Sequence, residues 1–130
     1  MASSTSLGSK NLVNRTILCI VDDPSRLLLY RSMLELRGHS VLVAATADEI
    51  LEVNKGTVID CAILDHERDS LSLAQKISRS HPSSPILLVS DRAEIPEKLS
   101  SLMEMFITRD EAIQDISSCV QELLHRRGCS

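Results

Sequence analysis

The sequence predicts an α/β fold, a doubly wound five-stranded parallel sheet with helices on both faces. Short apolar runs of strand length alternate five times with helical patterns, which is typical of repeated βα units. These runs are almost continuously apolar, as strands covered on both faces should be. For five strands, the common solution is an open three-layer sandwich with strand order 2-1-3-4-5.

Each element has its own local signal. The expected strands are 16–21, 40–45, 58–65, 85–90 and 105–108. The expected helices lie within 22–38, 46–56, 69–80, 95–103 and 110–127. Their start and stop signals are Pro24, Gly38, a Thr46–Glu49 capping box, Gly56, Asp69 or Ser70, and Asp110. The last helix has an expected apolar stripe of Ile113, Ile116, Val120, Leu123 and Leu124.

Length and composition fit one domain and exclude several functions. The 130 residues predict a domain over 15–126, a disordered Ser-rich lead-in at 1–14 and a frayed end at 127–130. A net charge of −4 and the absence of Trp argue against nucleic acid or an anionic membrane as a partner. No apolar run is long enough to span a membrane. Four cysteines without a CxxC pair support neither zinc nor redox chemistry, and we expect a cytoplasmic protein.

Polar residues stand where the predicted strands end. Asp22 and Asp23 follow the first strand, Asp65 ends the third, Ser90 ends the fourth and Arg109 follows the fifth. In a doubly wound sheet, ligands bind beyond the carboxyl ends of the strands, where the strand order reverses. That point lies between the first and third strands, so the two acidic ends should meet there.

Such a cluster suits phosphoryl chemistry. Adjacent carboxylates repel each other unless a proton or cation intervenes, and Mg²⁺ prefers such oxygen ligands. Asp65 beside Mg²⁺ could act as a nucleophile toward phosphorus, with Ser90 and Arg109 helping to neutralise charge. The plainer alternative is that Asp22 or Asp23 caps a helix, Ser90 merely ends a strand and Arg109 makes an ordinary ion pair.

The chain resembles the receiver domain of two-component response regulators, a CheY-like fold, from Thr16 to about Leu124. The motifs that carry the resemblance are "ILCIVDDP", "CAILD", "PILLVS" and "MFITRD". They place the family's phosphoaccepting aspartate on Asp65, its switch hydroxyl on Ser90 and its switch aromatic on Phe106.

The resemblance implies a non-enzymatic module of phosphorelay signalling, and we expect it to act as a stand-alone domain. A sensor histidine kinase or phosphotransfer protein would phosphorylate Asp65, with Mg²⁺ held by Asp22, Asp65 and the backbone carbonyl of Glu67. Asp23 is a further candidate ligand. A downstream protein would then bind the face built by the fourth helix, the fifth strand and the last helix.

Departures from the family pattern leave a second hypothesis open. Val21 stands where the first of two acids is usual, and Arg109 replaces a lysine. Asp91 follows Ser90 where a small residue is usual, and the loop after Asp65 is short. The alternative is a phosphorylation-independent pseudo-receiver that acts as a protein-interaction module. A nucleotide-binding enzyme on a flavodoxin-like sheet is disfavoured, because no Gly-rich loop follows the first strand.

Overall fold

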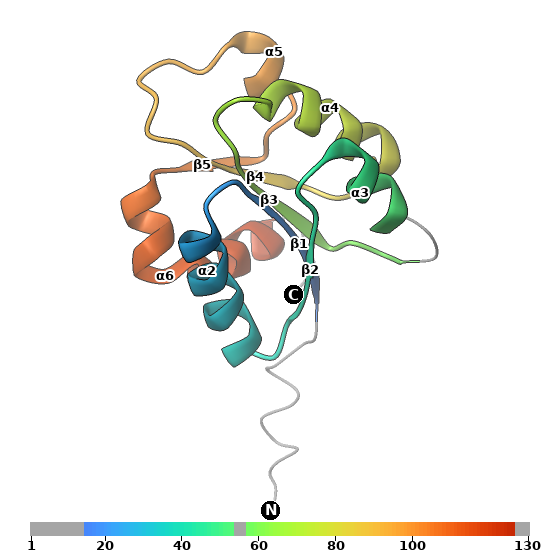
Figure 1. Ribbon diagram of the computed structural model, residues 1–130. Coiled ribbons are helices and arrows are strands. Elements are labelled where there is room, and N and C mark those ends of the chain that lie inside the picture. The colour runs from blue at the N-terminus through green and yellow to red at the C-terminus, as the bar shows by residue number, and fades with distance from the viewer. Residues whose placement is uncertain (1–14, 54–56, 127–130) are drawn as a thin grey trace, which may run out of the picture.

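A computed structural model describes residues 15–53 and 57–126. Its five parallel strands form one sheet in the order β2-β1-β3-β4-β5, which confirms the predicted topology (Figure 1). The strands are β1 (Thr16–Val21), β2 (Ser40–Val43), β3 (Cys61–Asp65), β4 (Ile86–Val89) and β5 (Met105–Ile107). The helices are α2 (Pro24–Leu36), α3 (Ala47–Val53), α4 (Ser70–Ser80), α5 (Glu97–Ser100) and α6 (Arg109–Arg126).

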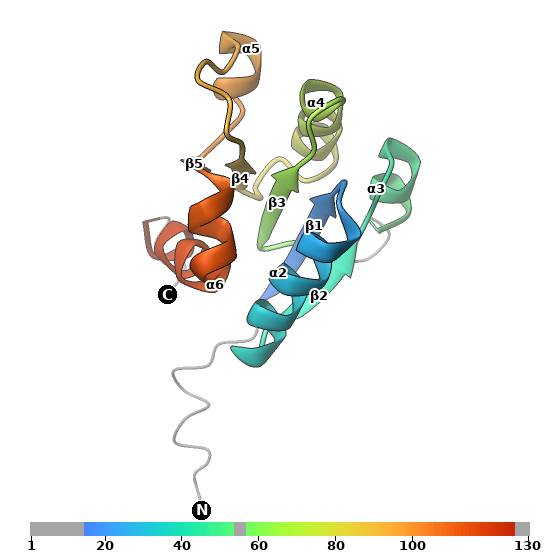
Figure 2. The same cartoon turned by 60° about the vertical axis from the view of Figure 1, so that its left-hand side comes forward.

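The helices form a layer on each side of the sheet. Helices α2 and α6 pack together on one face, and α3, α4 and α5 lie on the other (Figure 2). Because strand side chains point alternately to the two faces, Cys61 and Ile63 belong to the α2–α6 core, and Ala62 and Leu64 belong to the opposite core. The same alternation directs Asp65 toward the α2–α6 side.

Some strands are shorter than the apolar runs that predicted them. Strand β3 begins at Cys61 rather than at Val58, whose side chain is 78% exposed. Of the two residues just before the strand, Ile59 is buried in the core, and the Asp60 carboxylate accepts a hydrogen bond from the backbone N–H of Thr16 at 2.8 Å. The carboxyl end of β3 is where the sequence placed it, at Asp65.

The predicted boundary signals are found at the end of α2 and the start of α3, but not as a side-chain cap at α4. Gly38 has a φ of 90°, a left-handed conformation that favours glycine, just beyond α2. At α3, the Thr46 hydroxyl accepts from the Glu49 N–H at 3.2 Å, and the Glu49 carboxylate accepts from the Ala45 N–H at 2.6 Å. Asp69 precedes α4 but its side chain makes no capping hydrogen bond.

Helix α6 corrects two expectations. It begins at Arg109, one residue before the predicted Asp110 cap, and a capping box of Thr108 and Glu111 closes its first turn. Ile113 was expected in the apolar stripe but is 42% exposed, because a non-helical residue, Asp115 (φ −169°, ψ 81°), breaks the helix into two segments. The rest of the stripe, Ile116, Val120, Leu123 and Leu124, is buried.

Three expectations fall outside the described residues: the lead-in at 1–14, the Gly56 helix stop and the frayed end at 127–130. Within the part that the structure describes, no helix is long and apolar enough to cross a membrane.

Candidate functional site

The carboxyl ends of β1 and β3 meet as the strand order required. Val21 pairs with Asp65 in the parallel ladder, and the backbone N–H of Asp22 donates to the backbone carbonyl of Asp65 at 3.0 Å. The two acids predicted to share the switch point are therefore neighbours in space.

Asp65 is completely buried, with 0% of its surface exposed. Its carboxylate accepts four hydrogen bonds from three side chains. Oδ2 accepts from the Tyr30 hydroxyl at 2.8 Å and from Arg26 Nε at 2.9 Å. Oδ1 accepts from Arg26 Nη2 at 3.3 Å and from Arg109 Nε at 3.4 Å. A buried carboxylate is stable only when paired and hydrogen-bonded in this way.

Arg26 joins three carboxylates through one guanidinium. Besides Asp65, its Nη1 donates to Asp23 Oδ2 at 3.0 Å and its Nη2 donates to Asp22 Oδ1 at 3.0 Å. Burial disfavours the charged guanidinium, but the hydrogen bond to Asp65 and the charges of Asp65 and Asp23 outweigh it and raise the pKa of Arg26. The side chain is therefore a permanent cation inside the acidic cluster.

The start of α2 positions Arg26. The Asp23 carboxylate caps the helix by accepting from the Ser25 N–H at 3.1 Å, and Pro24 occupies the first helical turn. Residues three and four apart share a helix face, so Arg26 reaches back over its own first turn toward Asp22 and Asp23. The helix-cap role considered for Asp23 is thus confirmed, and the residue also serves the site.

Tyr30 lies one turn further along α2 and is fully buried. Burial, followed by the hydrogen bond to Asp65 and the negative charge of that carboxylate, raises the pKa of the Tyr30 hydroxyl above its ordinary value. The phenol consequently stays protonated and donates to Asp65. Its aromatic ring belongs to the α2–α6 core, so one residue links the core and the site.

Arg109 provides the cation expected after β5. Besides Asp65, its guanidinium contacts Glu67 Oε2 at 3.1 Å through Nη2. The backbone N–H of Arg109 donates to Asp91 Oδ1 at 3.0 Å. Asp91, which follows Ser90 where a small residue is usual in the family, thus accepts a hydrogen bond at the N-terminus of α6.

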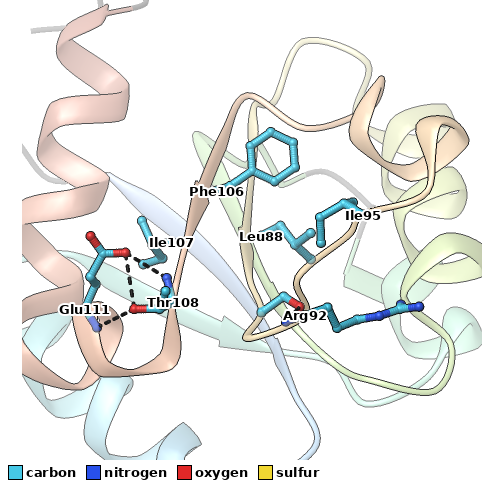
Figure 3. A pocket seen from close by; sticks show the side chains of 8 residues that line it. Leu88, Arg92, Ile95, Phe106, Ile107, Thr108 and Glu111 are labelled. Atoms are coloured by element: carbon cyan, nitrogen blue, oxygen red, sulfur yellow. Dashed lines mark hydrogen bonds between the residues drawn. The ribbon is translucent and has the colours of Figure 1, made fainter.

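Ser90 and Phe106 line a neighbouring hollow of about 230 Å³ rather than the carboxylate cluster. The Ser90 hydroxyl accepts from the Arg92 N–H at 3.1 Å. Phe106 is 48% exposed and lies on the side of Leu88 and Ile95 (Figure 3). The figure also shows the Thr108–Glu111 capping box at the other end of the hollow.

The arrangement of the acids does not fit the Mg²⁺ ion expected on Asp22, Asp23, Asp65 and Glu67. Across residues 15–53 and 57–126, no group of three or more His, Cys, Asp or Glu side chains is placed to hold a metal ion. Each of the three aspartates already accepts from Arg26 through one of its oxygens. The second Asp22 oxygen accepts from the Glu67 N–H at 3.1 Å.

Neither Arg26 nor Tyr30 was predicted from the sequence as a site residue. A signal for Arg26 was present, since it lies three and four residues after Asp23 and Asp22 on a predicted helix. Its contact with Asp65, 39 residues away, had no sequence signal.

No family model and no curated protein matches the sequence. Solved structures do match. A CheY-like response regulator receiver domain protein from Methanospirillum hungatei JF-1 is 22% identical, with a TM-score of 0.72 over 88% of this chain and 96% of the other.

A second match is the response regulator TrrA from Thermotoga maritima in complex with Mg²⁺-BeF. It is 23% identical, with a TM-score of 0.66 over 85% of this chain and 99% of the other. A structure of the histidine kinase ThkA in complex with TrrA also matches, at 21% identity and a TM-score of 0.70, over 85% of this chain and 98% of the other. The chain therefore has the fold of a CheY-like receiver domain, as the sequence motifs predicted.

Proposed function

We propose that this protein is a signalling module of the receiver fold that acts by binding other proteins without phosphorylation of Asp65. One observation carries the proposal: the Asp65 carboxylate is fully buried and accepts four hydrogen bonds from Arg26, Tyr30 and Arg109.

A phosphoaccepting carboxylate needs a free oxygen lone pair directed at the incoming phosphorus atom. Here both oxygens of Asp65 are already acceptors, and two guanidinium groups withdraw electron density from them. An incoming phosphoryl group would have to displace Arg26 or Tyr30, which would leave a buried donor without its acceptor. The network therefore opposes both approach to Asp65 and reaction at it.

The partner surface that we propose is the face formed by α5, β5 and α6. Phe106 lies half exposed on this face beside the hollow that Arg92 and Glu111 also line. An aromatic side chain with flanking charges of both signs suits a protein partner. A histidine kinase or phosphotransfer protein is the partner class we favour, since the matching TrrA structure contains a kinase. We also propose a non-enzymatic role. We propose a cytoplasmic location because the thiols of Cys19 and Cys61 are free, as is usual in a reducing compartment.

The alternative is that Asp65 accepts a phosphoryl group from a kinase, as the sequence motifs predicted. The position of Asp65 at the switch point and its contact with Arg109 favour this reading. It requires Arg26 to leave Asp65 during the reaction. That the module works as a stand-alone domain stays a prediction.

Intact-mass spectrometry after incubation with Mg²⁺ and acetyl phosphate separates the two functions. We expect no phosphoryl adduct on the wild-type protein, with an Asp65→Asn variant as the matched control and circular dichroism to show that both are folded. An adduct on the wild type that is absent from Asp65→Asn would establish the phosphoacceptor function instead.

A further inference from the structure

The guanidinium of Arg26 lies in the middle of the acidic cluster. Each of its three nitrogens donates to a different carboxylate: Nε to Asp65 at 2.9 Å, Nη1 to Asp23 at 3.0 Å and Nη2 to Asp22 at 3.0 Å. The Arg26 side chain is only 19% exposed. Its polar head is thus committed to these three acids.

Three carboxylates gathered at adjoining strand and helix ends require positive charge between them. A divalent metal ion is one solution, and a planar guanidinium with five fixed N–H donors is another. We propose that Arg26 is a built-in cation that takes the place of a divalent metal ion in this receiver-fold site, so that the site is assembled without metal.

Because Arg26 is covalently part of the chain, it has an advantage over a dissolved metal ion in binding to these carboxylates. The side chain projects from the first turn of α2, whose start is held by the Asp23 cap and Pro24. Its charge is therefore present at the cluster whenever the domain is folded, whereas a dissolved ion must give up translational freedom and hydration. Arg109 adds a second positive charge at Asp65 Oδ1, the oxygen to which Arg26 Nη2 also donates.

Removal of the Arg26 charge should change the affinity of the cluster for metal ions. In a variant with a neutral residue at position 26, the carboxylates of Asp22 and Asp65, which both accept from Arg26 Nη2 at 3.0 and 3.3 Å, lose their shared cation. Two carboxylates with bound water then become available to a divalent ion. Loss of one charge at hydrogen-bonding distance should raise Mn²⁺ affinity by at least about tenfold. Arg26→Lys keeps the charge and should bind Mn²⁺ about as weakly as the wild type.

The experiment is Mn²⁺ titration of the full chain, followed by electron paramagnetic resonance of the free ion. The variants are Arg26→Met, Arg26→Lys and the control Arg31→Met. Arg31 lies on the same helix and pairs with Glu35 on the surface, so its loss tests the general effect of removing one positive charge. We expect tighter binding for Arg26→Met only, and loss of this gain when Asp65→Asn is added.

Wild-type protein that binds Mn²⁺ as tightly as Arg26→Met would overturn the inference, as would a folded Arg26→Met variant with unchanged affinity. If Arg26→Met does not fold, Arg26→Gln carries the same test, because its amide is neutral and still donates a hydrogen bond. This inference goes beyond the proposed function and fails separately from it: an Asp65 phosphoryl adduct contradicts the function, and the Mn²⁺ affinities alone decide the role of Arg26.

Discussion

Replacement of Asp65 by asparagine tests the central network most directly. The carboxylate accepts four hydrogen bonds, two on each oxygen, from Arg26, Tyr30 and Arg109. An asparagine amide has one acceptor oxygen, and its NH₂ group would face donors. If the amide oxygen takes the position of Oδ2, the NH₂ group takes the position of Oδ1. The hydrogen bonds from Arg26 Nη2 and Arg109 Nε are then lost, and both nitrogens face the NH₂ donor.

The magnitude follows from these contacts. A hydrogen bond to a charged group contributes about 1.5–3 kcal/mol, and breaking a buried ion pair costs about 3–5 kcal/mol. The Oδ1 bonds are long, at 3.3 and 3.4 Å, and both arginines are about a fifth exposed, so water relieves part of the loss. We expect Asp65→Asn to lower the free energy of unfolding by about 2–4 kcal/mol, which corresponds to a fall in Tm of roughly 10–15 °C.

Urea unfolding is the assay, followed by circular dichroism and by the fluorescence of Tyr30, the single tyrosine. The control is Asp69→Asn, which removes the same charge from an exposed cap position without a side-chain hydrogen bond. We expect this control to lie within about 0.5 kcal/mol of the wild type. If Asp65→Asn is no less stable than Asp69→Asn, the network does not hold the site together and the reasoning above is refuted.

Three further predictions concern two single hydrogen bonds and a pair of buried histidines. Tyr30→Phe keeps the buried ring but removes the donor to Asp65, and should cost about 1–2 kcal/mol in urea unfolding. Thr108→Ala removes the hydroxyl that accepts from the Glu111 N–H at the start of α6, and should cost about 1 kcal/mol. His39 and His81 have pKa values lowered chiefly by burial, so the unfolded chain takes up protons first, and stability should fall as pH drops below about 6.5.

These outcomes have distinct controls. A Tyr30→Phe variant as stable as the wild type would mean that the phenol adds nothing beyond packing. For Thr108, a serine variant should retain most of the stability that alanine loses, and equal losses would contradict the capping role. For the histidines, a double replacement by glutamine should flatten the pH dependence of unfolding between about pH 6.5 and 5, and an unchanged slope would contradict the prediction.

Much of the architecture was predictable because it depends on short-range patterns. Continuous apolar runs such as Thr16–Val21 predicted buried parallel strands, and Gly38 and the Thr46–Glu49 box predicted helix ends. The approach of Asp22 to Asp65 was also predictable, because a five-stranded doubly wound sheet brings those two strand ends together. The Asp110 cap was wrong because Thr108 and Glu111 form the capping box of the first turn. The Thr-x-x-Glu pattern that predicted the Thr46–Glu49 box is also present at Thr108–Glu111, so the sequence did carry a signal for this cap.

By itself, the sequence determined a doubly wound five-stranded sheet with acids at its carboxyl edge, since hydrophobic periodicity predicts the strands and helices and the topology rules predict the strand order. The likeness to a receiver fold came from the resemblance of its motifs. Only the tertiary structure decided which side chains contact those acids. The direction of Asp65 toward α2, and the reach of Arg26 and Tyr30 to it, depend on how a helix packs over a strand some forty residues away in the chain. The cation at the centre of the cluster is therefore an arginine of the protein, and its identity followed from packing across the sheet.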